Sequence, residues 1–236
     1  MSPVPCYDIY RLKIIAHGIK SLPQAKKAIR AGVDFLEIDV SKRFFFNKFC
    51  AQHNGLMGIF GLGPILETLL TAEVRSRAFL DLKPVSLRNS FTHKFAELLT
   101  KTGVKNARIC GHNWELISAL CKKTGASPFY TLKNKGGLEK FKRQLHLLKK
   151  PAGLSVHYRL ITKDLINYCS KLKAENFSRS LPRELARGSK NKKALSFEIW
   201  AWTVNDLKEA KRLAHLKVDG IITDEWGKLL KSGSSF

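Results

Sequence analysis

FLEIDV, residues 35–40, has the apolar character of a buried β-strand, yet it carries two carboxylates, Glu37 and Asp39. Side chains two residues apart on a strand point to the same side, so the two acids share one face. Two unpaired carboxylates pointing together into a site of low dielectric constant repel each other and need a cation. A divalent metal ion is the simplest cation for such a pair, so this strand predicts a metal site.

Short apolar runs recur along the chain, in alternation with helix-like segments. The strand candidates are eight runs, at residues 13–16, 34–40, 78–83, 107–110, 127–132, 153–156, 197–204 and 220–223. The segments between them are amphipathic, with helix boundary signals such as Ser21 as an N-cap and Gly32 after the helix end. This pattern predicts an α/β protein with a (β/α)8 TIM barrel, and an open doubly wound sheet is the second choice. We expect residues 1–236 to form one domain, since α/β barrels of this length do not divide.

Two segments interrupt the alternation of strands and helices. Residues 41–63 predict a hairpin-like loop that rises from the end of the second strand and ends in a Gly-rich turn. Residues 174–195 are polar and basic, and they predict an extended loop with one short helix before the seventh strand. Residues 64–74, between the hairpin and the third strand, are expected to be helical.

The chain is strongly basic, with 42 Lys and Arg against 19 Asp and Glu and a formal net charge of +23. Such a field attracts anionic membranes, nucleic acids and phosphorylated small molecules, although solvated helix faces account for it equally well. Nucleic acid is not an expected partner, because no zinc finger, Arg-rich repeat or aromatic-basic cluster is present. The five cysteines lack the spacing of a disulfide framework or a zinc site. Without a secretory signal or a membrane-spanning run, we expect a cytoplasmic protein.

Active sites of TIM barrels lie at the C-terminal ends of the strands. Polar and aromatic side chains occur at or just after these ends: His17, Glu37, Asp39, His53, Asp81, Lys83, His112, Tyr130, His157, Trp202 and Asp224. The three acids Glu37, Asp39 and Asp81 converge from two strands and offer only oxygen ligands, which select Mg²⁺ or Ca²⁺ over zinc. Lys83 shares a strand face with Asp81, where it either contacts a phosphate oxygen or pairs with the acids. Asp224 either orients a neighbouring group or caps the final helix, and capping is the simpler interpretation.

Six motifs in order suggest what kind of site this is: AHG (16–18), AGVDFLEIDV (31–40), QHN (52–54), DLKP (81–84), WAWTVND (200–206) and VDGIITDEW (218–226). Together they resemble the glycerophosphodiester phosphodiesterase family, over nearly the whole chain. The resemblance implies a metal-dependent hydrolase on a TIM barrel, which splits a glycerophosphodiester into glycerol 3-phosphate and an alcohol. In the family's scheme the attacking group can be the substrate's own neighbouring hydroxyl, which gives a cyclic phosphate that water then opens.

The resemblance also implies roles for individual residues. By position, Glu37, Asp39 and Asp81 would be metal ligands, and His17 and His53 the acid–base pair. Lys83 would contact the phosphate, and Trp202 would form a wall of the site. His112 and His157 stand at equivalent strand ends and are further candidates for substrate contact.

The chain departs from the family pattern in three motifs, and the family's inserted subdomain after the second His is reduced to a short stretch. His17-Gly18-Ile19 stands where the family usually has His-Arg-Gly, so an Arg is missing that Lys42 or Arg43 could replace. His53-Asn54 stands for His-Asp, and Asp81-Leu82-Lys83 stands for Glu-x-Lys. The Asp in this last motif, with no Arg after the first His, resembles the pattern of the sphingomyelinase D-like relatives. Cleavage of lysophospholipids is therefore an alternative function. A non-catalytic barrel that binds anionic lipid or nucleic acid through its basic surface is another.

Overall fold

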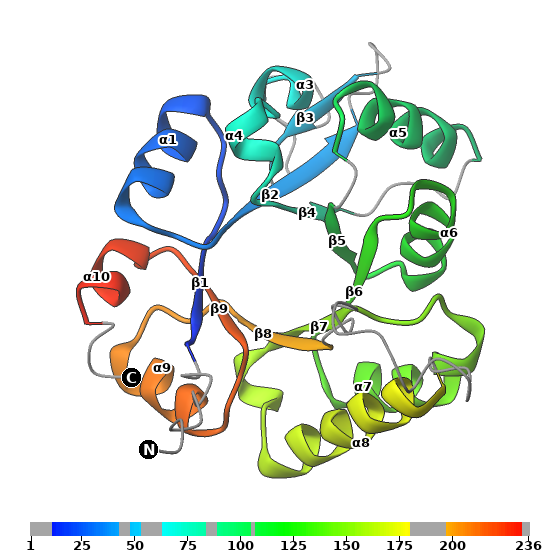
Figure 1. Ribbon diagram of the computed structural model, residues 1–236, viewed down its shortest axis with the longest axis vertical. Helices are drawn as coiled ribbons and strands as arrows, with labels where there is room; N and C mark the ends of the chain where they lie inside the picture. The colour runs from blue at the N-terminus through cyan, green and yellow to red at the C-terminus, as the bar shows by residue number, and fades with distance from the viewer. Residues whose placement is uncertain are drawn as a thin grey trace, which may run out of the picture.

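The computed structural model describes residues 11–42, 48–52, 63–83, 89–104, 107–179 and 197–232. Within these ranges the chain forms a barrel of eight parallel strands with helices packed around the outside (Figure 1). The fold prediction of a TIM barrel is therefore confirmed, and the open sheet is wrong because β1 pairs with both β2 and β9 and closes the ring.

The barrel strands lie where the apolar runs predict them, to within a few residues at each end. They are β1 (Lys13–Ala16), β2 (Phe35–Lys42), β4 (Ala78–Leu82), β5 (Arg108–Gly111), β6 (Ser127–Leu132), β7 (Gly153–His157), β8 (Glu198–Trp202) and β9 (Gly220–Thr223). Around the barrel they follow the order β1, β2, β4, β5, β6, β7, β8, β9. A short strand, β3 (Phe49–Ala51), pairs antiparallel with the end of β2, which confirms the hairpin expected there.

Helices fill the connections. They are α1 (Leu22–Ala31), α3 (Leu66–Leu69), α4 (Ala72–Arg75), α5 (Asn89–Lys101), α6 (Trp114–Thr124), α7 (Lys135–Gln144), α8 (Lys163–Arg179), α9 (Leu207–His215) and α10 (Trp226–Lys231), with the 3-10 helices η1 (Leu145–Leu147) and η2 (Tyr158–Leu160). As predicted, Ser21 caps α1 by accepting a hydrogen bond from the Gln24 N–H, and Gly32 ends it in the left-handed conformation at φ 96°.

Residues 64–74 are largely helical, as expected, and form two short helices because the backbone is extended at Thr71, just before α4. One prediction about the connections needs correction. Residues 174–179 continue α8, whose earlier turns pack Leu165 and Cys169 into the core, so a polar composition did not end the helix. The remainder of the predicted loop before β8 lies outside the described residues.

Alternation along the strands divides the core into two parts. Side chains on one face pack outward against the helices, while Ile15, Phe79, Cys110, Phe129, Trp200 and Ile222 form a separate cluster that fills the barrel interior. The Trp200 ring lies 4.6 Å from Phe79 and 4.8 Å from Phe129, measured between ring centroids. These packed aromatic rings fill part of the barrel interior.

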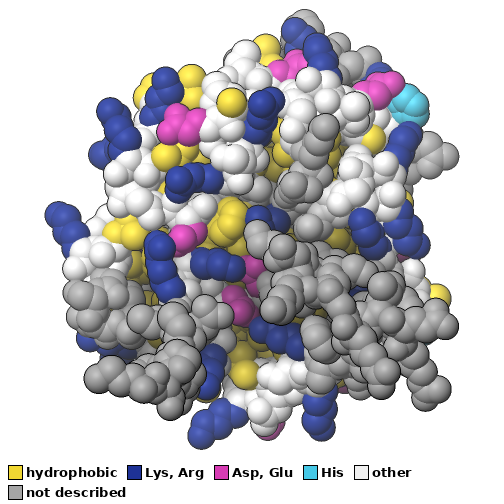
Figure 2. Space-filling view, viewed as in Figure 1, with side chains coloured by type: hydrophobic (Ala, Val, Ile, Leu, Met, Phe, Trp, Pro, Cys, Tyr) yellow, Lys and Arg dark blue, Asp and Glu magenta, His cyan; other side chains and the backbone are white. Residues whose placement is uncertain are grey.

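Lys and Arg side chains are scattered across the face shown in Figure 2, with a few acidic side chains near its middle. The basic residues do not form a single stripe on this face, in keeping with their spread along the sequence. No helix within the described ranges is long and apolar enough to cross a membrane.

Candidate active site

Three carboxylates meet at the C-terminal ends of β2 and β4. Parallel pairing places Asp39 beside Asp81, and Glu37 lies two residues earlier on the same face of β2. One oxygen from each of the three side chains lies within 4.8 Å of the others, and Glu37 and Asp39 are buried. The register of two neighbouring strands thus creates the acidic cluster that the alternation in FLEIDV predicts.

Lys83 supplies positive charge to this cluster. Its Nζ forms ion pairs with Asp39 and with Asp81, the latter at 2.5 Å. Burial works to lower the pKa of Lys83, but Asp81 and Asp39 outweigh it and raise the pKa above its ordinary value. Of the two roles considered for this lysine, the structure shows the pairing with the acids.

The pKa of Glu37 reflects its burial beside two other acids. Burial raises its pKa well above the ordinary value, and the charges of Asp39 and Asp81 raise it further, against the effect of Lys83. Its Oε2 accepts a hydrogen bond of 2.8 Å from the Gly18 N–H. Gly18 has φ 64°, a conformation that favours glycine, so the backbone here suits the residue at this position.

His17 follows β1 and is held on one side by Asp224. Its Nδ1 lies 2.7 Å from Asp224 Oδ1, and its Nε2 lies 4.0 Å from Glu37 Oε2. Burial works to raise the pKa of Asp224, but hydrogen bonds from His17 and Asn205 lower it below its ordinary value. An ionised carboxylate only accepts, so Nδ1 carries a proton, and Nε2 lies on the side of the acids.

Asn205 fixes the orientation of Asp224. Its Oδ1 accepts hydrogen bonds from the Asp224 N–H at 2.9 Å and from the Thr223 hydroxyl at 3.0 Å. Its Nδ2 therefore donates to Asp224 Oδ2, at 2.9 Å. Asn205 was not among the residues predicted for the site, although it lies in the WAWTVND motif.

The capping role predicted for Asp224 is wrong. Helix α10 begins after Glu225, whose side chain makes no capping hydrogen bond, while both oxygens of Asp224 are used by His17 and Asn205. Asp224 therefore orients a neighbouring group, which was the alternative role considered for it.

A cavity of about 280 Å³ opens between these groups and the opposite side of the barrel. It is lined by His17, Glu37, Phe79, Asp81, Lys83, Cys110, His112, Thr131, Lys133, Ser155, Trp202, Thr203 and Ile222. Burial and the charges of Lys83 and Lys133 lower the pKa of His112, against the opposing effect of Asp81. The neutral imidazole of His112 is thus favoured near neutral pH.

The other predicted site residues are placed as follows. His157 is not among the cavity-lining residues described, and its ring stacks on Tyr158 and lies perpendicular to the Trp202 ring. Lys42 ends β2 outside the described cavity lining, while His53 and Arg43 lie outside the described residues.

Tyr130 does not belong to the site. It packs in the core between the barrel and the helices, and its hydroxyl donates to the Lys149 carbonyl at 2.6 Å. Its neighbour Thr131 points to the interior instead, because adjacent residues on a strand face opposite ways. Tyr130, the residue predicted from the sequence, is thus the wrong member of this pair, and the prediction omitted Thr131, together with Lys133 and Ser155 on the same wall.

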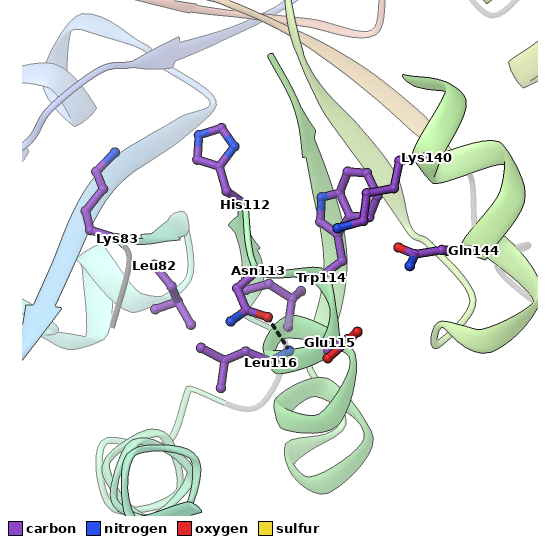
Figure 3. A pocket seen from close by; sticks show the side chains of 10 residues that line it. Leu82, Lys83, His112, Asn113, Trp114, Glu115, Leu116, Lys140 and Gln144 are labelled. Carbon is purple, nitrogen blue, oxygen red and sulfur yellow. Dashed lines mark hydrogen bonds between the residues drawn. The ribbon is translucent and has the colours of Figure 1, made fainter. Parts of the chain in front are cut away.

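A second cavity, of about 360 Å³, opens outside the strand ends (Figure 3). Its lining comprises Leu82, Lys83, His112, Asn113, Trp114, Glu115, Leu116, Ile117, Lys140 and Gln144. Asn113 caps α6 by accepting from the Leu116 N–H at 3.1 Å, the dashed contact in Figure 3. Lys83 and His112 line both cavities, so the two spaces adjoin at these side chains.

Comparisons with known proteins find the same fold. No protein-family model matches the chain, and no curated protein matches its sequence. A phosphodiesterase from Oleispira antarctica, solved in complex with the product sn-glycerol-3-phosphate, aligns with a TM-score of 0.69 and 17% identity, covering 96% of this chain and 98% of its own. Glycerophosphodiester phosphodiesterases from Parabacteroides distasonis and Thermotoga maritima align with TM-scores of 0.67 and 0.60 at 17% and 19% identity, each covering 95% of this chain and 98% of theirs. The chain therefore shares its barrel fold, over almost its full length, with structures of this class of enzyme.

Proposed function

We propose that this protein is a metal-dependent phosphodiesterase that hydrolyses glycerophosphodiesters to glycerol 3-phosphate and an alcohol. The observation that carries the proposal is the juxtaposition, in one cavity, of a three-carboxylate cluster and a histidine oriented by a carboxylate. The fold shared with glycerophosphodiester phosphodiesterases supports it, as does the product bound in the Oleispira antarctica enzyme.

The acidic cluster fits a divalent cation. Asp81 Oδ1 is buried and has no hydrogen-bond partner in the part of the chain that the structure describes. Glu37, Asp39 and Asp81 would hold the ion, and an all-oxygen set suits Mg²⁺ or Ca²⁺. When bound, the ion would neutralise charge that develops on the phosphate oxygens.

Lys83 and the histidines would act on the substrate. Lys83, released from one of its acids, would offer its ammonium group to a non-bridging phosphate oxygen. His17 would accept a proton at Nε2 while Asp224 stabilises the imidazolium that forms. The acid–base partner of His17 would be His53, which would exchange the second proton with the leaving or attacking oxygen.

The remaining contacts follow from the two cavities. Trp202 and His112 would border the substrate in the inner cavity, and His157 would support Trp202 through their edge-on contact. The alcohol of the diester would occupy the outer cavity, beyond Lys83 and His112. The chain would act as one cytoplasmic domain whose basic surface allows contact with anionic membranes.

Release of glycerol 3-phosphate from glycerophosphocholine and glycerophosphoethanolamine tests the proposal, with Mg²⁺, Ca²⁺ or EDTA present. We expect turnover that requires metal and is lost in His17→Ala. His93→Ala is the matched control, because His93 pairs with Glu97 on the surface of α5 and does not line the cavity. Folded wild-type protein that releases no glycerol 3-phosphate with either metal would contradict the proposal.

A further inference from the structure

The outer cavity carries two charges of opposite sign on its helical side. Lys140 on α7 and Glu115 on α6 both line it, together with the neutral amide of Gln144 (Figure 3). Neither charged side chain forms an ion pair with any residue that the structure describes. Lys140 and Glu115 therefore share one cavity but lie too far apart to pair with each other.

The position of Lys140 is set by Trp114. The Lys140 Nζ lies 5.3 Å from the centroid of the Trp114 ring, in a cation–π contact. This ring is buried, its Nε1 donates to the Thr131 carbonyl at 3.2 Å, and Phe141 packs edge-on against it. Trp114 supplies the only indole or phenyl ring among the described lining residues of this cavity. A choline group, which binds to aromatic faces, would have to displace Lys140 from that ring.

Glu115 is placed by the start of α6. It lies in the first turn of this helix, directly after Trp114. Asn113 caps the helix by accepting a hydrogen bond from the Leu116 N–H at 3.1 Å. The helix dipole favours a carboxylate in the first turn. The positive and the negative charge at the cavity thus both project from helix positions that the fold defines.

Opposite charges in one cavity limit the chemistry of the alcohol that fits it. A carboxylate on the alcohol is complementary to Lys140, and an ammonium group is complementary to Glu115. An alcohol with only a cationic group leaves Lys140 without a partner, and one with only an anionic group leaves Glu115 without one. An alcohol that carries both groups matches the two side chains at once.

We propose that Lys140 and Glu115 select diesters whose alcohol is a hydroxy amino acid, with its carboxylate at Lys140 and its ammonium group at Glu115. Serine is the simplest such alcohol. The inference rests on the proposed function, in which the acids and Lys83 hold the phosphate and the alcohol enters the outer cavity past His112. Hydrolysis breaks the bond between phosphorus and the serine oxygen, which leaves with a proton, and water supplies the new oxygen of glycerol 3-phosphate.

The test combines a change in the protein with the matching change in the substrate. Three diesters of glycerol 3-phosphate separate the two charges of the alcohol. The first carries serine, the second carries ethanolamine, which lacks the carboxylate, and the third carries 3-hydroxypropanoate, which lacks the ammonium group. Lys140→Met and Glu115→Gln each remove one charge from the protein and keep the length of the side chain.

Each ion pair should change kcat/KM by about fivefold, because both side chains are exposed to water. For wild type we therefore expect kcat/KM about fivefold higher with the serine diester than with either of the other two. Lys140→Met should lower kcat/KM about fivefold for the serine and hydroxypropanoate diesters, and leave it within about twofold for the ethanolamine diester. Glu115→Gln should lower it about fivefold for the serine and ethanolamine diesters, and leave the hydroxypropanoate diester within about twofold.

Lys142→Met and Glu73→Gln are the matched controls. Lys142 also lies on α7 and makes a cation–π contact, 5.5 Å from the Tyr168 ring centroid, but it does not line the cavity. Glu73 also lies in the first turn of a helix, α4, and is likewise absent from the cavity lining. Both variants should leave the order of the three diesters unchanged.

Equal kcat/KM of wild type for the three diesters would overturn the inference, as would an equal loss on all three in Lys140→Met or in Glu115→Gln. If wild type cleaves no diester, the proposed function fails, and calorimetry with phosphoserine and phosphoethanolamine decides about the outer cavity. Tighter binding of phosphoserine, weakened by Lys140→Met, then supports the inference. Equal dissociation constants for the two phosphate monoesters overturn it.

Discussion

Asp224→Asn should disable His17 without changing the fold, because the hydrogen bonds around Asp224 determine how the new amide is oriented. Asn205 Nδ2 donates to Asp224 Oδ2, and it cannot turn around because its Oδ1 is held by the Asp224 N–H and by Thr223. The amide introduced at position 224 must therefore give its oxygen to Asn205 and its NH₂ group to His17. Nδ1 of His17 then becomes the acceptor, and the ring proton moves to Nε2, where it blocks the base.

The size of the effect follows from the geometry and exposure of this pair. The His17–Asp224 contact is a charge-assisted hydrogen bond of 2.7 Å, and a histidine with the wrong tautomer typically loses general-base catalysis by about 10²- to 10⁴-fold. Since 52% of the Asp224 side chain is exposed, water competes for His17 and we expect the lower end. A fall in kcat/KM of about 10²-fold corresponds to about 2.7 kcal/mol of transition-state stabilisation.

The measurement is the initial rate of glycerol 3-phosphate release at saturating metal, together with a thermal melt to verify folding. Asp206→Asn is the matched control, because Asp206 caps α9 by accepting from the Glu209 N–H and does not line either cavity. Adding Asn205→Asp to Asp224→Asn should recover activity at least about tenfold, because the amide can then donate to position 205 and present its oxygen to His17. Retention of more than half of wild-type activity by Asp224→Asn, or no recovery in the double variant, would refute the reasoning.

Two further predictions concern stability. In metal-free protein at pH 8, Glu37→Gln should raise the thermal midpoint by about 2–8 °C, because it removes a buried charge beside other acids. Burial raises the pKa of Glu37 above its ordinary value of 4.5, so the folded chain holds this proton where the unfolded chain releases it. The wild-type protein therefore loses stability as the pH rises between the two pKa values, and a variant with the same pH slope would contradict this account. Gly153→Ala should lower the free energy of unfolding, measured by chemical denaturation, by about 1–3 kcal/mol. The reason is that a Cβ at this position would lie 2.4 Å from Cε1 of Phe129. Gly227→Ala, with nothing within 4 Å of the added carbon, should not destabilise the protein, and similar losses in both variants would argue against a packing cause.

The alternation of apolar runs and amphipathic segments determined which residues form strands, because both periods are local properties of the chain. It also determined that Glu37 and Asp39 share a face, and that Lys83, directly after the end of β4, lies two residues beyond Asp81 on the same side. Local signals likewise located the caps of α1. These features need no knowledge of what lies across the barrel.

Tertiary structure alone decided the contacts between distant segments. The register of β2 on β4 sets Asp39 beside Asp81, and barrel closure brings Asp224 to His17 across 207 residues of sequence. The same closure decides that Thr131 faces the cavity while Tyr130 packs against the helices, since both neighbours suit a strand and only the curvature of the sheet defines its interior. Sequence periodicity therefore predicts which acids share a strand face. The partners that orient His17, and the residues that face the acids, depend on how eight strands close into a ring.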